Sequence, residues 1–353
     1  MPWQSNVRTV TPYVAGEQPG RADIIKLNTN ESPYPPSPSV VAALAALDAA
    51  DMRLYPDPDC GGLTRSLAAY HDLTPDQVFV GVGSDDVLAL SFLTFYNSEK
   101  PILFPDVSYS FYPVWADLYR IPRQTVPLDD DFRLVKEDYL AQNGGIIFPN
   151  PNAPTGLFAE LDVVEYIVAK NRGSVVIIDE AYIDFGGESA LPLIKKYDNL
   201  LVVRTFSKSR ALAGLRVGYA LGQEKLISYL RDAKFATNSY TMNTAALALG
   251  DAALRDEAYF KAMTARIVST RTWFKEELTG LGFIYPEPLG NFIFARHPRI
   301  GAAALFAALR EDGILVRYWS LPRIDDYLRI TIGSDEDMRR LSAFLARLCG
   351  SFA

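Results

Sequence analysis

Residues 175–182 read VVIIDEAY, and this stretch decides the class of fold. Four consecutive apolar residues followed directly by acids are typical of a short strand that is buried on both faces of a parallel sheet. Similar short apolar runs recur along the chain, at 78–81, 102–104, 146–148 and 200–203. Helical stretches such as 85–96 and 160–170 separate them. This alternation predicts βαβ units and an α/β fold with a mostly parallel sheet.

The pattern changes after this region. A long stretch with helical periodicity, 251–280, precedes a set of shorter elements. Strands are expected at 283–285, 292–295, 314–316 and 327–332, and helices at 302–311 and from 335 onward. The change indicates a second, smaller α/β domain. We expect an N-terminal arm at 1–34, a large domain at 35–251 and a small C-terminal domain at 252–353.

Composition narrows the classes of function. The 353 residues include 35 Lys and Arg against 42 Asp and Glu, a net charge of -7, which disfavours nucleic-acid binding. No apolar run is long enough to cross a membrane. Cys60 and Cys349 lie too far apart in the sequence for a zinc-thiolate motif, and so few cysteines fit a reducing cytoplasm. His71 and His297 are expected at the surface, so we expect no metal site and no histidine base.

Chemically useful residues follow the apolar runs, where open α/β sheets place their ligands. Asn152 lies in a rigid, proline-rich loop after 146–148, and Asp179 follows 175–178. Lys208 and Arg216 follow 200–203. A lysine, an acid and an amide in one crevice suit pyridoxal phosphate, which binds a lysine covalently and needs its ring nitrogen protonated. The glycine turn at 81–85 would offer a helix N-terminus to the phosphate.

Each of these residues alone has an ordinary structural explanation. Asp179 could cap a helix, Lys208 could be a solvated surface lysine, and Arg216 could belong to a simple ion pair. The glycine turn is a poor dinucleotide fingerprint, because Asp86 stands where a third glycine is required. The order of all these groups after successive strands favours the cofactor site over independent structural roles.

With these residues in place, the chain resembles the fold-type I, class II pyridoxal-phosphate aminotransferases, and most closely the histidinol-phosphate aminotransferases. The resemblance runs from 8–13 (RTVTPY) to 327–333 (YLRITIG). Its most specific pieces are 27–33 (LNTNESP), 54–57 (LYPD), 150–156 (NPNAPTG), 179–182 (DEAY), 207–208 (SK) and 212–219 (LAGLRVGY). It implies a large domain with a seven-stranded sheet flanked by helices, a smaller C-terminal domain and an N-terminal arm.

The resemblance also implies roles at the cofactor. Lys208 would bond covalently to pyridoxal 5'-phosphate and later move the proton, while Asp179 would pair with the ring nitrogen. Asn152 and Tyr182 would hydrogen-bond the ring oxygen, and Tyr109 would stack on the ring. The implied phosphate-binding set is Ser84, Asp85, Ser207 and Arg216, joined by Tyr55 from a neighbouring subunit. The last of these residues implies a homodimer with shared active sites.

Substrate-binding positions implied by the resemblance are Tyr13, Arg317 and Arg329. The expected reaction is transamination of L-histidinol phosphate with 2-oxoglutarate, in histidine biosynthesis. Trp319, in a stretch that varies across the family, leaves an aromatic-amino-acid aminotransferase as an alternative. A threonine-phosphate decarboxylase of the same fold and a non-catalytic cofactor-binding regulator also stay open at this point. Asp86 replaces the glutamate that is usual in the family and is expected to contact structure rather than cofactor.

Overall fold

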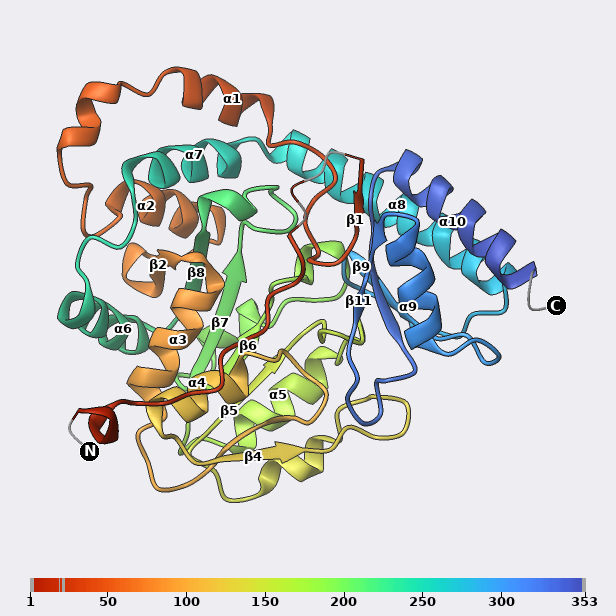
Figure 1. Ribbon diagram of the computed structural model, residues 1–353. Coiled ribbons are helices and arrows are strands. Elements are labelled where there is room, and N and C mark those ends of the chain that lie inside the picture. The colour runs from red at the N-terminus through yellow and green to blue at the C-terminus, as the bar shows by residue number, and fades with distance from the viewer. Residues whose placement is uncertain (1–2, 19, 21–22, 351–353) are drawn as a thin grey trace.

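The computed structural model describes residues 3–18, 20 and 23–350, and a seven-stranded sheet lies at the centre of its larger part (Figure 1). In their order across the sheet, the strands are β2 (Val78–Val82), β8 (Val217–Gly222), β7 (Leu200–Thr205), β6 (Val176–Asp179), β5 (Gly145–Pro149), β3 (Ile102–Pro105) and β4 (Arg123–Val126). Only β8 runs antiparallel to its neighbours. The predicted mostly parallel seven-stranded sheet is thereby confirmed.

Helices cover both faces of this sheet. They are α1 (Pro38–Ala45), α2 (Gly61–Tyr70), α3 (Gly83–Phe95), α4 (Tyr112–Tyr119), α5 (Leu161–Lys170), α6 (Glu224–Thr237) and α7 (Thr244–Arg255). Val176 and Ile178 pack into the core shared with α2, α5 and α7, whereas Ile177 packs on the opposite face with α3, α4 and α6. Successive strand residues point to opposite faces, so a strand covered on both sides needs an unbroken apolar run.

The pattern of apolar runs did not predict strand β8, because glycines interrupt its sequence. Gly218 lies against the first turn of α3, and a Cβ there would come within 2.2 Å of the Gly83 carbonyl carbon. A glycine is therefore required at this strand position, and the close approach brings the start of α3 next to the end of the sheet.

The smaller part contains α8 (Glu257–Gly280), α9 (Ala302–Glu311) and α10 (Asp335–Gly350). Its strands are β9 (Phe292–Ala295), β11 (Arg317–Tyr318) and β12 (Leu328–Thr331) in one antiparallel sheet, and β1 (Ile25–Lys26) paired in parallel with β10 (Ile314–Leu315). Strand β1 belongs to the N-terminal arm, and Ile25 and Leu27 lie in the core of the small domain. The arm is thus anchored on the C-terminal part of the chain.

The single helix expected at 251–280 is wrong: two helices meet at Asp256, whose carboxylate accepts a hydrogen bond from the Tyr259 N–H and caps α8. Leu254 packs in the core of the large domain and Ile267 in that of the small domain. We propose the expected division into an arm, a large domain and a small domain, with the junction at Asp256 in place of 251/252, because Leu254 still packs in the large domain. The expected strand at 283–285 is reduced to one bridge between Ile284 and Arg296.

The expectation that both histidines lie at the surface is also wrong. His297 is 3% exposed and packs edge-on against Phe283. His71 is half-buried, lies 3.1 Å from the Tyr219 hydroxyl, and burial lowers its pKa to about 3. Neither histidine borders the main cavity.

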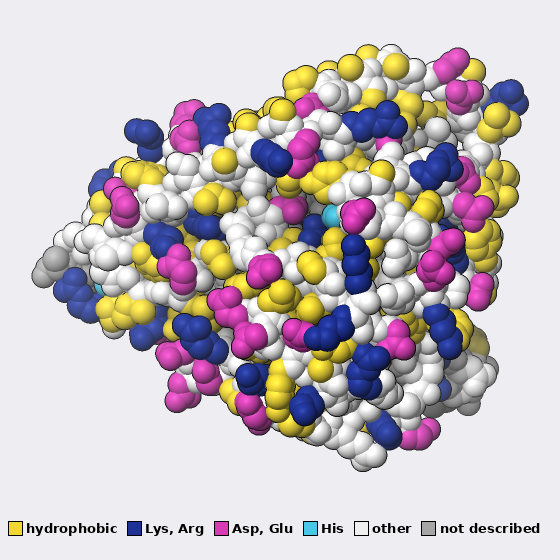
Figure 2. Space-filling model, turned by 180° about the vertical axis from the view of Figure 1, so that it is seen from behind, with side chains coloured by type: hydrophobic (Ala, Val, Ile, Leu, Met, Phe, Trp, Pro, Cys, Tyr) yellow, Lys and Arg dark blue, Asp and Glu magenta, His cyan; other side chains and the backbone are white. Residues whose placement is uncertain are grey.

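The outer surface carries charges of both signs. Figure 2 shows Lys and Arg side chains interspersed with Asp and Glu side chains over one face. Among the helices of the described ranges, none combines the length and the apolar character that a membrane crossing requires.

Candidate active site

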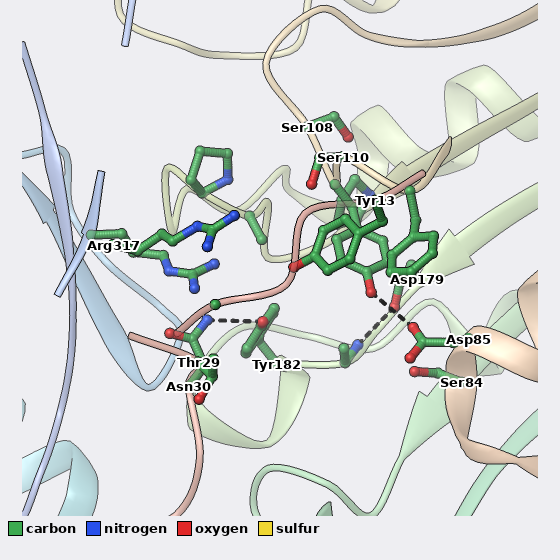
Figure 3. Close-up of a pocket in the computed structure, with 18 of the residues that line it drawn as sticks. Tyr13, Thr29, Asn30, Ser84, Asp85, Ser108, Ser110, Asp179, Tyr182 and Arg317 are labelled. Atoms are coloured by element: carbon green, nitrogen blue, oxygen red, sulfur yellow. Dashed lines mark hydrogen bonds between the residues drawn. The ribbon is translucent and has the colours of Figure 1, made fainter. Parts of the chain in front are cut away.

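A cavity of about 690 Å³ lies at the carboxyl ends of the central strands, bordered by the small domain and by the N-terminal arm (Figure 3). Most residues that the sequence predicts for the site line it: Tyr13, Ser84, Asp85, Tyr109, Asp179, Tyr182, Ser207, Lys208, Arg216, Arg317 and Arg329. The carboxyl ends of parallel strands meet at one edge of a sheet, so residues far apart in the sequence converge there.

Asp179 ends strand β6 and is 4% exposed. Its carboxylate accepts hydrogen bonds from the Tyr112 hydroxyl (3.1 Å) and the Ala181 N–H (3.2 Å), and both donors are neutral. Burial raises the pKa of Asp179 to about 7. The adjacent Glu180 is equally buried but is ion-paired with Arg204 at 2.8 Å. Asp179 therefore remains available to a positively charged donor in the cavity.

The first turn of α3 and the side chain of Arg216 form one corner of the cavity. Gly83 has φ +81°, and a Cβ at this position would lie 2.6 Å from Nη2 of Arg216. Arg216 can therefore reach the helix N-terminus, where it pairs with Asp85 at 3.0 Å and donates to the Ser207 hydroxyl at 3.4 Å. The N-cap residue of α3, Val82, makes no side-chain cap hydrogen bond, and the start of this helix lies beside a guanidinium and the hydroxyls of Ser84 and Ser207. Such a helix start suits a phosphate.

Lys208 lies on the loop after β7. Its Nζ donates to the Thr29 carbonyl oxygen at 3.1 Å and lies 5.8 Å from the centre of the Tyr182 ring. Burial, together with the nearby positive charge of Arg329, lowers the pKa of Lys208 to about 8. Such an amine loses its proton far more readily than a surface lysine, so it can act as a nucleophile or a base.

The arm completes the floor of the cavity in a way that the sequence did not indicate. The Asn28 carbonyl accepts a hydrogen bond from Arg329 at 2.9 Å, and the Asn30 amide donates to the Tyr182 hydroxyl at 2.9 Å. Together with the Thr29 carbonyl, these contacts attach three successive arm residues to three site residues. The stretch 27–33 stood out as a motif, but backbone carbonyls leave no signal in a sequence.

Two arginines form the opposite end of the cavity. Arg317 and Arg329 are neighbours across β11 and β12, and both guanidinium groups lie over the Trp319 ring, at 5.3 and 5.2 Å from its centre. Each donates to a main-chain carbonyl, that of Val14 and that of Asn28. Within the described part of the chain, Nε of Arg329 is buried without a partner. These unneutralised cations favour an anionic ligand.

Aromatic residues form one wall. Tyr109 donates its hydroxyl hydrogen to Asp85 at 2.8 Å, beside the corner at α3. Tyr13, from the arm, stacks on Phe111 with ring centres 4.1 Å apart. Flat apolar surfaces of this kind suit an aromatic ligand ring.

Two predicted residues do not line the cavity. Asn152 lies behind it, where its Nδ2 donates to the Val107 carbonyl (3.1 Å) and the Thr155 hydroxyl (2.9 Å). Tyr55 is 82% exposed and stacks on Tyr240 at 4.6 Å, on the outer surface. Asp86, as expected, contacts structure: its carboxylate accepts the Val82 N–H at 2.9 Å.

Comparisons with known proteins agree with this geometry. The model of the family Aminotransferase class I and II matches residues 22–345. The chain is 52% identical to the histidinol-phosphate aminotransferase of Lactococcus lactis subsp. lactis (strain IL1403), over 98% of this chain and 96% of that protein. It is 53% identical to histidinol-phosphate aminotransferase 1 of Hydrogenovibrio crunogenus, over 96% and 95% of the two chains.

A solved structure is similar in fold over the same extent. The histidinol-phosphate aminotransferase from Sinorhizobium meliloti, in complex with pyridoxal-5'-phosphate, superposes with a TM-score of 0.86. The match covers 95% of this chain and 93% of that chain, at 27% identity. The family match and the full-length relatives at about half identity establish that the chain belongs to the class I and II aminotransferases.

Proposed function

We propose that this protein transfers the amino group of L-histidinol phosphate to 2-oxoglutarate, giving imidazole-acetol phosphate and glutamate in histidine biosynthesis, with pyridoxal 5'-phosphate as cofactor. The observation that carries this proposal is the meeting of Asp179, Lys208 and the Arg216 corner in one cavity. Relatives that share about half of the sequence over its full length carry the name of this activity.

The residues present fit the cofactor. Asp179 is a buried carboxylate with only neutral partners, which suits a protonated ring nitrogen. The start of α3 with Ser84, Ser207 and Arg216 suits the phosphate, and Lys208 is the lysine for the covalent bond. Asp85 would hold Arg216 and Tyr109 in place through its two oxygens. These are the residues that would hold the cofactor.

Two further positions would act on the ring itself. Tyr182 presents its hydroxyl to the cavity and would hydrogen-bond the ring oxygen, whereas Asn152 donates to the Val107 carbonyl and the Thr155 hydroxyl. Tyr109 would cover the ring face. When bound, pyridoxal phosphate supplies an electron-accepting ring that stabilises the electron pair left on the substrate carbon as its proton departs.

The chain's own residues then carry the proton and the substrate. Lys208, with its pKa lowered to about 8, provides a substantial fraction of neutral amine near physiological pH, and Nζ can take a proton and return it. Burial raises the pKa of Asp179 to about 7, and a cation facing its carboxylate would favour the ionised form. Arg329, Arg317 and Tyr13 lie where the substrate's anionic groups would bind.

The arginine pair favours a phosphorylated substrate. Arg317 and Arg329 lie side by side over one indole ring with carbonyl partners, and two adjacent cations match a doubly charged phosphate better than a neutral aromatic side chain. Glutamate would present a carboxylate to the same pair in the other half-reaction.

We further propose a homodimer with shared active sites. Its support is the exposure of Tyr55, of its stacking partner Tyr240, and of Met52 and Leu54 beside it in the sequence. Contiguous exposed apolar surface of this kind is typical of an interface. We propose a cytoplasmic location, in keeping with two free, buried cysteines, Cys60 and Cys349.

Replacing Lys208 tests the catalytic assignment. We expect Lys208→Ala to bind pyridoxal phosphate without the yellow absorption of lysine-linked cofactor and to lose at least about 10²–10⁴-fold in kcat, because the proton carrier is gone. Lys195→Ala, which removes an exposed lysine on the surface, is the matched control and should resemble the wild type. Absorption spectra and steady-state rates with histidinol phosphate decide the matter; an unchanged spectrum with full turnover would remove Lys208 from the site.

Replacing Asp179 should have opposite effects on stability and activity: the cofactor-free protein should become more stable, whereas transamination should be impaired. In the cofactor-free chain the pKa of Asp179 lies near 7, against 3.8 ordinarily, so the folded state binds the extra proton and stability falls as pH rises from about 4 to 7. We expect Asp179→Asn to remove this loss and to stabilise the cofactor-free protein at pH 8 by up to about 4 kcal/mol, while impairing transamination.

Urea unfolding of both cofactor-free chains at pH 4 and pH 8 measures the effect of Asp179→Asn. The control Asp72→Asn changes a fully exposed carboxylate, and it should change the free energy of unfolding by no more than about 0.5 kcal/mol at either pH. If Asp179→Asn were less stable than the wild type by the same amount at both pH values, the carboxylate of Asp179 would not be a buried charge that destabilises the cofactor-free fold.

Replacing Arg329 tests whether glutamate and histidinol phosphate bind their anionic groups at the same arginine. Arg329→Lys keeps the charge but loses the paired hydrogen bonds of a guanidinium, so we expect kcat/KM to fall by roughly two to four decades in both half-reactions. The cofactor spectrum of the resting enzyme should stay nearly unchanged, and Arg340→Lys, on the outer surface, should be silent. Stopped-flow rates with glutamate and with histidinol phosphate are compared. A loss with glutamate alone would place the substrate phosphate elsewhere, with Arg317 as the next candidate.

Subunit mixing tests the shared site. Tyr55→Ala and Lys208→Ala chains are each expected to be inactive, but a mixed dimer would contain one intact site. Random exchange should restore about one quarter of wild-type activity, since about half of the dimers are mixed and each has one intact site of two. No recovery under conditions of demonstrated subunit exchange would rule out a contribution of Tyr55 across the interface.

A further inference from the structure

Asn30, in the arm, is 1% exposed and makes hydrogen bonds through both its main chain and its side chain. Its N–H donates to Oγ1 of Thr331 at 3.0 Å, and its carbonyl accepts from Nδ2 of Asn291 at 3.0 Å. Its side-chain Oδ1 accepts from the Thr331 hydroxyl at 2.9 Å, while Nδ2 donates to the Tyr182 hydroxyl at 2.9 Å (Figure 3). Every polar group of Asn30 is therefore occupied by a protein partner.

These contacts determine which way the amide points. The Thr331 hydroxyl has one hydrogen, and its oxygen already accepts the Asn30 N–H. Among the described residues, Oδ1 of Asn30 is the acceptor placed beside this hydrogen, so the hydrogen is directed to Oδ1 and the NH₂ group faces Tyr182. In the reverse orientation the buried Thr331 oxygen would accept both N–H groups of Asn30, and its hydrogen would face no acceptor supplied by the described residues.

The orientation of the amide in turn directs the hydroxyl of Tyr182. The phenol oxygen accepts a hydrogen from Asn30, so its own single hydrogen cannot point back along the same line. Tyr182 lines the cavity, so its hydrogen is turned away from Asn30 and is free to point into the cavity. Burial raises the pKa of Tyr182, while the charge of Arg329 and the Asn30 hydrogen bond act in the opposite direction. The hydroxyl stays protonated near neutral pH and can donate.

We propose that Asn30 is a positioning residue whose amide is oriented by Thr331. By donating to the phenol oxygen of Tyr182, Asn30 directs the hydroxyl hydrogen of Tyr182 to the ring oxygen of the bound cofactor. This inference rests on the proposed function for the identity of the acceptor. Thr331 belongs to β12 of the small domain and Asn30 to the arm, whereas Tyr182 belongs to the large domain. The hydrogen-bonding state of the cofactor oxygen thus depends on the packing of the arm on the small domain.

The variants follow from the local geometry. Asn30 has φ +55°, a left-handed conformation that Asp and Gly tolerate and most residues do not. Asn30→Asp replaces the incoming donor with an acceptor, to which Tyr182 would donate instead of to the cofactor. Asn30→Gly removes the donor alone. Thr331→Val removes the hydroxyl that orients the amide, and Thr331→Ser, which keeps it, is the matched control.

The first measurement uses the cofactor-free chain. Tyrosine labelled with ¹³C at Cζ reports the ionisation of each phenol, and Tyr182→Phe identifies the signal. A donor to the phenol oxygen stabilises the phenolate, so Asn30→Gly and Thr331→Val should move the onset of Tyr182 ionisation to higher pH, and Thr331→Ser should not. If neither variant moves it, the assigned orientation is wrong.

The second measurement uses the enzyme with bound pyridoxal phosphate. A hydrogen bond donated to the ring oxygen stabilises the negative charge on that oxygen. The nitrogen that links Lys208 to the cofactor then loses its proton more readily. We expect the pH midpoint of the cofactor's absorption change to rise by about one unit in Asn30→Asp, the equivalent of one hydrogen bond, and by less in Thr331→Val. Thr331→Ser should restore the wild-type midpoint.

The two measurements separate this inference from the proposed function. An unchanged midpoint in Asn30→Asp and Thr331→Val, with cofactor bound, would overturn the positioning role. Failure of the wild-type chain to bind pyridoxal phosphate would overturn the proposed function and the named acceptor, while the phenol titration still decides the role of Asn30 in orienting Tyr182.

Discussion

The carboxylate of Asp179 is buried at the end of β6 with neutral partners only, and much of the site follows from that uncompensated charge. Burying a charge without a counter-ion destabilises the fold, so the surrounding structure must hold it firmly. Parallel strands covered on both faces provide that rigidity, and Tyr112 and the Ala181 N–H fix the orientation of the carboxylate. The adjacent Glu180 shows the contrasting case, because its pairing with Arg204 leaves it nothing to offer a ligand.

The other end of the cavity carries positive charge. Arg317 and Arg329 share one indole and donate to main-chain carbonyls, so positive charge accumulates there. Burial and the proximity of Arg329 also lower the pKa of Lys208. The cavity is therefore suited to ligand groups that are cationic where they face Asp179 and anionic where they face Arg317 and Arg329.

The arm ties these regions together. Residues 28–30 contact Arg329 and Lys208 through main-chain carbonyls and Tyr182 through the Asn30 amide. Strand β1, just before them, pairs with β10 of the small domain. The two domains and the arm therefore meet in one hydrogen-bonded set, and a shift of any one of them would alter the site.

Local pattern was sufficient to predict the strands of the large domain and the residues at their ends. An apolar run of four residues can only be covered on both faces, and the polar residue that follows it must lie at the sheet edge, so Asp179 and Lys208 were readable from the sequence. The tertiary structure decided what depends on residues distant in the chain. The burial of His297 and strand β8 with its glycines follow from neighbours contributed by other segments. The contacts of Asn30 with Thr331 join residues about 300 positions apart, and no periodicity within either segment encodes them.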